Sequence, residues 1–339
     1  MYDMPAFVKS DTELVRDYLN RNHLYRTAKL HTVKRALVDD NFGSLNLSST
    51  GWHNFTTIYP LDSVSEKDYF TEMKAAPYQW SYGCGAGSYT SCNGVGRTTD
   101  FAADSLQSIF TILAGSYFGD WDIRNNLLKA PLANSALVSF WGGIPKWYIH
   151  TMALGKNIGF GIRESMNNRG EYFTGNFNLS YNSVHMALMG DPTLKLNYTE
   201  GPKNAMASSA ENNVTVTWEA AEQKVEGYYV YEMEDYQRAH YKRSELLTEL
   251  TFVDSNKRRQ GDITYIVRSV TYDTTNSGSY EILSPAIYAT VNHTYDRTLS
   301  AANDISISSA KLYPNPSNGS VDVQLPFASN TVVSSKVLT

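Results

Sequence analysis

PYQWSYGCGAGSYTSCNGVGRTTDFAADSLQSIFTILAGSYFGDWD, residues 77–122, is the stretch that decides the fold of this chain. Its aromatic run at 78–82 predicts a buried strand, because large apolar side chains suit a packed, pleated surface. A second apolar run at 109–114 predicts another strand. Each run ends in a glycine-rich or polar segment, and in α/β proteins ligands bind beyond the carboxyl ends of the strands. The stretch therefore predicts an α/β sheet with a functional edge.

A cysteine, Cys84, stands at the end of the first predicted strand, between Gly83 and Gly85. Glycines let the backbone turn sharply and let a partner approach closely, so a thiol in this setting is open to attack a substrate. The chain has two cysteines, too few for a disulfide framework or a four-cysteine zinc site. Cys84 and Cys92 could pair with each other, which would silence the thiol, and a structural role is favoured for Cys92.

Composition places the chain among globular proteins and excludes two classes. Of its 339 residues, 42% are hydrophobic and 19% charged, which supports two or three domains with cores of their own. The net charge of −5 argues against a nucleic-acid partner, which requires clustered Lys and Arg. No run approaches 18 apolar residues, so no transmembrane segment is expected. The start, MYDMPAF, does not resemble a signal peptide, so either the protein stays inside the cell or its front is missing.

Residues 1–200 predict alternating strands and helices. Ser10 and Glu13 form a capping-box pattern that opens a helix, and His53 lies in a turn-rich region at 51–55. Further helices are expected at 65–75, 124–132, 147–155 and 184–189, and further strands at 36–40, 136–141 and 193–196. This alternation predicts a mostly parallel sheet with helices on both faces.

Residues 201–293 change to period-two strands without a helical stripe. Roughly ninety such residues is the length of one β-sandwich. The order Trp218, Gly227-Tyr-x-Val-Tyr, Tyr265-x-Val-Arg and Ser284-Pro285 resembles a fibronectin type III domain of the immunoglobulin-like class.

A polar linker is expected at 294–309, followed by a small β unit at 310–339. Its opening, Lys-Leu-Tyr-Pro-Asn-Pro-Ser-Asn-Gly at 311–319, resembles the C-terminal sorting domain of the type IX secretion system of Bacteroidota. The resemblance implies that the protein is secreted or held at the outer cell surface, with the secretion machinery as a partner. The unit breaks off after about thirty residues, so we expect truncation at this end as well.

Several segments of residues 1–198 together resemble the C-terminal half of the gingipain-type cysteine peptidases, family C25, which have a caspase-like α/β fold. The segments are Thr50-Gly-Trp-His53, Gly83-Cys84, Ile112-Leu-Ala-Gly-Ser116 leading to Phe118-Gly-Asp120, and Leu188-Met-Gly-Asp-Pro-Thr-Leu194. The resemblance implies a cysteine endopeptidase that acts on polypeptide substrates.

The resemblance also implies roles for particular residues. Cys84 would be the nucleophile and His53 its base, because the thiolate is the reactive species. Backbone N–H groups at Gly83 and Gly85 would hold the oxyanion. The loop with Ser116, Tyr117, Asp120 and Asp122 would shape the substrate pocket, in which the two carboxylates would favour a basic side chain.

The sequence departs from the family pattern at the histidine. Trp52 separates Gly51 from His53, and Asn54 follows where the family has glycine. An inactive module that binds proteins or glycans at the cell surface is therefore the alternative to an active peptidase. No metal ligands stand at sensible spacing and no cofactor is expected, although scattered aspartates leave structural calcium open.

Overall fold

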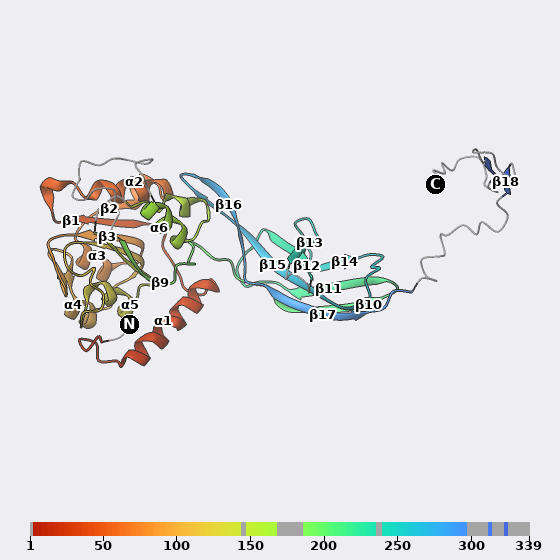
Figure 1. Ribbon diagram of the computed structural model, residues 1–339, viewed down its shortest axis with the longest axis horizontal. Coiled ribbons are helices and arrows are strands. Elements are labelled where there is room, and N and C mark those ends of the chain that lie inside the picture. The colour runs from red at the N-terminus through yellow and green to blue at the C-terminus, as the bar shows by residue number, and fades with distance from the viewer. Residues whose placement is uncertain are drawn as a thin grey trace.

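The computed structural model describes residues 3–143, 147–167, 186–234, 239–296, 311–313 and 322–324. An α/β domain is followed by an all-β domain (Figure 1). The α/β domain holds a six-stranded sheet in the order β2-β1-β3-β7-β8-β9. The strands are β1 (Ala36–Asp40), β2 (Val64–Glu66), β3 (Tyr78–Cys84), β7 (Ser108–Ala114), β8 (Val138–Gly142) and β9 (Met186–Gly190). All pairs are parallel except β8–β9. The predicted mostly parallel sheet is confirmed.

Helices cover both faces of this sheet, as the alternation predicts (Figure 1). The α-helices are α1 (Asp11–Arg26), α2 (Ser48–Ile58), α3 (Tyr69–Ala75), α4 (Thr98–Ala103), α5 (Ala130–Asn134) and α6 (Ile158–Asn167). The 3-10 helices are η1 (Gly43–Leu45), η2 (Leu61–Ser63), η3 (Leu127–Lys129) and η4 (His150–Leu154). One core lies between the sheet and α2, η4 and α6, and the other between the sheet and α3, α4 and α5.

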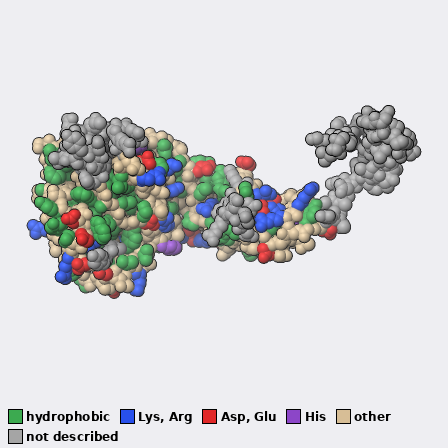
Figure 2. Space-filling model, viewed as in Figure 1, with side chains coloured by type: hydrophobic (Ala, Val, Ile, Leu, Met, Phe, Trp, Pro, Cys, Tyr) green, Lys and Arg blue, Asp and Glu red, His purple; other side chains and the backbone are tan. Residues whose placement is uncertain are grey.

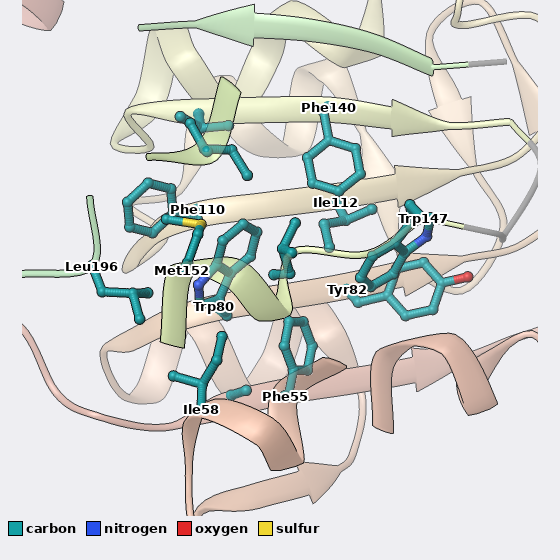
Figure 3. Packing of buried hydrophobic residues seen from close by; sticks show 14 of the residues in the cluster. Phe55, Ile58, Trp80, Tyr82, Phe110, Ile112, Phe140, Trp147, Met152 and Leu196 are labelled. Carbon is teal, nitrogen blue, oxygen red and sulfur yellow. The ribbon is translucent and has the colours of Figure 1, made fainter. Parts of the chain in front are cut away.

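Aromatic side chains of the central strands fill the first core (Figure 3). The ring of Trp80 on β3 stacks on Phe110 of β7 with centroids 4.8 Å apart. Tyr82 meets Trp147 edge to face at 5.2 Å, and Phe55 of α2 packs on Trp80. Such pairs add about 0.5–1.5 kcal/mol beyond the area they bury. The aromatic run at 78–82 is therefore the centre of the core, as the sequence indicates.

Several predicted elements of the α/β domain are wrong. Residues 51–55 lie within α2 and not in a turn, and 64–66 form β2 before α3 begins at Tyr69. The expected helix at 184–189 is the edge strand β9 in its described part, because pairing with β8 overrides the helix propensity of Met, Ala and Leu. Residues 193–196 form no strand. The helix expected at 124–132 is the shorter pair η3 and α5, and the one at 147–155 is η4.

The second domain is a sandwich of two antiparallel sheets around one core. One sheet has the order β10-β11-β14, and the other has β13-β12-β15-β16, with β17 also paired to β15. The strands are β10 (Lys203–Ala210), β11 (Asn213–Glu219), β12 (Gly227–Glu234), β13 (Ala239–Lys242), β14 (Thr251–Asp254), β15 (Gly261–Thr275), β16 (Gly278–Leu283) and β17 (Ile287–His293). Trp218 and Tyr265, two of the residues on which the resemblance to a fibronectin III domain rests, lie in this core.

Beyond the sandwich, β18 (Lys311–Tyr313) and β19 (Asp322–Gln324) form an antiparallel pair. Residues 297–309 of the predicted linker, together with residue 310 and residues 314–321 that hold most of the Tyr-Pro-Asn-Pro motif, lie outside the described residues. Within the described part, no helix has both the length and the apolar character needed to cross a bilayer.

A hairpin formed by the ends of β15 and β16 projects from the sandwich onto the α/β domain (Figure 1). At its tip, Asn276 Nδ2 donates to Thr56 O at 2.8 Å and to Tyr59 O at 2.7 Å, at the end of α2. Ser277 Oγ donates to Thr57 O at 2.9 Å. The carbonyls at a helix end lack partners within the helix, so the hairpin caps α2 from another domain.

The hairpin meets the amino edge of the sheet. Lys34, two residues before β1, forms an ion pair with Asp273 of β15. Because the first five strands of the sheet run parallel, their carboxyl ends lie at the opposite edge. The hairpin of the sandwich therefore does not cover the edge that carries Cys84.

Candidate functional site at the carboxyl edge of the sheet

Two aspartates end β1 and point to opposite faces of the sheet, as successive strand residues do. Asp40 Oδ2 accepts the backbone N–H of Ser48, the first residue of α2, at 2.8 Å, and its Oδ1 accepts that of Phe42 at 3.0 Å. Asp39 Oδ2 accepts the N–H of Tyr69, the first residue of α3, at 2.8 Å. Carboxylates are favourable at helix N-termini, so this strand end holds one helix on each face.

Cys84 is the cross-strand partner of Asp40 and has no exposed surface. Its thiol donates to Asp40 Oδ1 at 3.3 Å and to Asp39 O at 3.6 Å. Burial, together with the neighbouring Asp40 carboxylate, raises the pKa of the Cys84 thiol far above its ordinary value. The sulfur is therefore held protonated as a hydrogen-bond donor, whereas nucleophilic chemistry needs the thiolate.

His53 lies on the exposed side of α2. The resemblance implies that His53 stands beside Cys84 as its base, but His53 occupies the sixth position of α2. In the described structure the Cys84 thiol donates hydrogen bonds to Asp40 and Asp39 of the neighbouring strand. The position next to the sulfur, where a base is needed, thus holds a carboxylate that already accepts two backbone N–H groups.

The glycines around Cys84 serve close packing. A side chain at Gly83 would meet Tyr69 and Val95 at 2.9 Å, and one at Gly85 would run into the backbone of Asn93. The N–H of Gly85 donates to Ala114 O at 3.0 Å, so it is already used within the fold. The glycines therefore let the chain at 93–95 pack closely on the α3 face of this strand end, opposite the α2 face on which the Cys84 thiol lies.

Cys92 is a second buried free thiol, and no disulfide joins it to Cys84. Its Sγ donates to Gly85 O at 3.6 Å and to Ala114 O at 3.8 Å, and burial raises its pKa to about 12. The structural role favoured for Cys92 agrees with these contacts.

The loop that follows β7 carries the other predicted site residues, Ser116, Tyr117, Asp120 and Asp122. All four are exposed, and the loop touches the segment after Cys84, since a side chain at Gly87 would collide with the backbone of Ser116. The structure therefore places them at the predicted edge but on its outer surface, while Cys84 lies beneath.

Sequence reasoning missed the role of Asp39 and Asp40. The signal was present, because two adjacent carboxylates follow an apolar strand. What a single sequence does not show is which neighbouring strand carries the cysteine, and the register between β1 and β3 decides the chemistry of the thiol. Among the described residues, no group of three or more His, Cys, Asp or Glu side chains could hold a metal ion.

Comparison with known proteins gives no family. No protein-family model matches the chain, and no curated protein matches it. Solved structures match part of the chain. The crystal structure of FN3tt is 12% identical, with 28% of this chain and 95% of that one covered and a TM-score of 0.22. A Fn3-like protein from Clostridium thermocellum is 18% identical, with 29% and 95% covered and a TM-score of 0.22. Domains A168–A170 of titin are 13% identical, with 29% and 33% covered and a TM-score of 0.23.

Fibronectin III-like domains are thus among the structural neighbours, at low overall scores. The sandwich is defined by its own strand pairing. The resemblances to gingipain-type peptidases and to the sorting domain stay hypotheses.

Proposed function

We propose that this chain is a non-catalytic binding protein built on a cysteine-peptidase-like α/β scaffold. The observation that carries the proposal is the state of Cys84, whose buried thiol donates to Asp40 at 3.3 Å. A cysteine peptidase needs a base that takes the thiol proton, and a neighbouring cation or helix N-terminus to stabilise the thiolate. Here the neighbouring group is an anion, which favours the protonated thiol.

The surroundings of the thiol support the same proposal. Stabilisation of a tetrahedral oxyanion requires N–H groups that are free to donate to it. The N–H of Gly85 already donates to Ala114 O, and the chain at Asn93 occupies the space above it. The thiol itself is buried on the α2 face of the sheet and has no exposed surface that a substrate carbonyl could reach.

Such a scaffold can bind a ligand through the exposed loops of the same edge. The loop at 115–126 presents polar and aromatic side chains to solvent, and the hairpin of the sandwich docks at the opposite, amino edge. We propose an extracellular or cell-surface ligand, either a protein or a glycan. Export by the type IX machinery is part of this proposal and rests on the resemblance of residues 311–319.

The test is labelling of the native protein with peptidyl electrophiles capped by Arg or Lys, mapped by mass spectrometry. We expect no modification of Cys84 in the native state and full modification after denaturation. The Cys84→Ala variant serves as the blank, and Cys92 in the same protein reports how a second buried thiol behaves. Selective labelling of native Cys84 that disappears in His53→Ala would overturn the proposal and restore a cysteine endopeptidase.

A further inference from the structure

Three large aromatic side chains stand exposed on two loops at the carboxyl edge of the sheet. Tyr89 is 41% exposed, Tyr117 60% and Trp121 50%. Tyr89 lies in the turn between β4 (Gly87–Ser88) and β5 (Ser91–Cys92), and the other two lie in the loop after β7. Figure 2 shows apolar side chains spread over the α/β domain in that view, with acidic ones among them. We call Tyr89, Tyr117 and Trp121 the aromatic platform.

The backbone at Tyr117 is strained. Its φ of 71° lies in the left-handed region, which costs a residue other than glycine roughly 1–2 kcal/mol. The next residue, Phe118, is fully buried, so the turn sends one ring into the core and the other out to solvent. Glycine or asparagine would fit this conformation with less strain. A bulky aromatic residue that is kept there against its backbone preference points to a use for the exposed ring.

Hydrogen bonds to the underlying chain hold both loops in place. The buried Asn126 donates from Nδ2 to Phe118 O at 3.0 Å and to Asp120 O at 3.1 Å. Trp141 Nε1 donates to Gly115 O at 2.7 Å, at the start of the same loop. The carbonyl of Tyr89 accepts the N–H of Leu127 at 2.9 Å. Little conformational entropy is therefore lost when a ligand settles on this surface.

The tyrosine rings of the platform lie side by side. The centroids of Tyr89 and Tyr117 are 5.6 Å apart, with 55° between the ring planes. Because the two ring planes are steeply inclined to each other, they do not form a flat face on which a planar aromatic ligand could stack across both rings. Asp120 and Asp122 are exposed on the same loop and offer carboxylate oxygens as hydrogen-bond acceptors.

We propose that the aromatic platform binds a neutral hexose polysaccharide. The C–H groups on the face of a pyranose ring carry partial positive charge and are attracted to the negative face of an aromatic ring. Sugar hydroxyls are donors for the two carboxylates, and such bonds to a charged acceptor are the stronger kind. With a net charge of −5, the chain disfavours an acidic polysaccharide. The inference deepens the binding function proposed above and rests on it.

The experiment is isothermal titration of the full chain with cellohexaose, mannohexaose, maltohexaose and laminarihexaose, with polygalacturonate as an acidic comparison. We expect one or more neutral hexasaccharides to bind with a Kd of roughly 10 μM to 1 mM, as for a small open site. Tyr117→Asn should weaken binding by about tenfold or more, which corresponds to about 1.4 kcal/mol. The same variant should not lower the unfolding midpoint, since asparagine relieves the backbone strain.

The control is Tyr288→Ala, which removes a tyrosine of similar exposure (54%) from β17 of the sandwich and should leave binding unchanged. Absence of binding by all four neutral hexasaccharides at millimolar concentration would refute the platform as a glycan site. Unchanged affinity in Tyr117→Asn, or equal loss in Tyr288→Ala, would refute it as well. Cys84 labelling is independent of this titration, so a failed titration with an unlabelled thiol leaves the non-catalytic function standing.

Discussion

Asn276 at the tip of the β15–β16 hairpin should stabilise a domain to which it does not belong. Its amide makes two hydrogen bonds to carbonyls at the end of α2, at 2.8 and 2.7 Å. Each is worth a net 0.5–1.5 kcal/mol in typical cases, and the site is partly exposed, so Asn276→Ala should cost about 1–2 kcal/mol. For a unit of this size, that lowers the unfolding temperature by about 2–8 °C.

The readout can be confined to the other domain. Of the six tryptophans, only Trp218 lies in the sandwich, so intrinsic fluorescence reports chiefly on the α/β domain. We expect Asn276→Ala to shift the fluorescence-detected midpoint. The matched control is Asn292→Ala, which removes an exposed amide hydrogen bond to Asp262 within the sandwich. If the two variants shift the fluorescence midpoint equally, the hairpin does not support α2 and the reasoning fails.

Three further outcomes follow from single groups. Asp40→Ala leaves two backbone N–H groups without their acceptor and should lower the free energy of unfolding in urea by about 2 kcal/mol. Asp40→Asn keeps an acceptor oxygen and should lose less, so equal losses would contradict this account. The Lys257 ammonium is buried between the carboxylates of Glu232 (2.6 Å) and Asp254 (3.0 Å), so Lys257→Met should cost about 3–5 kcal/mol of unfolding free energy in the same assay. A loss below about 1 kcal/mol would contradict a stabilising role for this buried ion pair. Burial opposes ionisation of Asp191, but its hydrogen-bond donors outweigh burial and lower its pKa. Its stabilisation is thus present above about pH 4 and lost as pH falls further, and Asp191→Asn should show a shallower acid loss between about pH 5 and 2.

The parts of the fold that were predictable are those in which local pattern and tertiary structure agree. The aromatic run at 78–82 forms β3, and the capping box at Ser10 opens α1 with both of its hydrogen bonds. Period-two alternation predicted an all-β unit at 201–293, and strands such as β11, β12 and β15 lie where the pattern is clearest. In each case the residue pattern fits the face that is buried.

The failures come from elements that the rest of the fold stabilises. Residues 48–58 contain serine, threonine and glycine, which disfavour a helix, yet α2 forms because Asp40 caps it and Phe55 and Ile58 enter the core. Residues 186–190 favour a helix but pair with β8.

For the candidate site, the edge was predictable, and so was the position of the loop after β7. The chemistry of Cys84 was not, because it depends on the register of β1 against β3, which puts Asp40 beside the sulfur. A sequence reports that small residues surround a thiol, but not whether the space they leave is open to solvent or filled by another segment.

Attachment at two separate points has a mechanical consequence. The chain passes from the α/β domain into the sandwich at residues 196–202, where Gln79 Nε2 donates to Leu196 O at 2.6 Å. The hairpin tip forms hydrogen bonds with the end of α2 at a second place. A body joined to its support by one flexible point swivels freely, whereas one held at two points has lost that rotation. The two domains should therefore turn together, as a stiff arm whose far end always presents the same loops outward. A freely swivelling domain loses rotational entropy when it binds its ligand. If the sandwich is anchored to a surface, the α/β domain has already lost this entropy during folding.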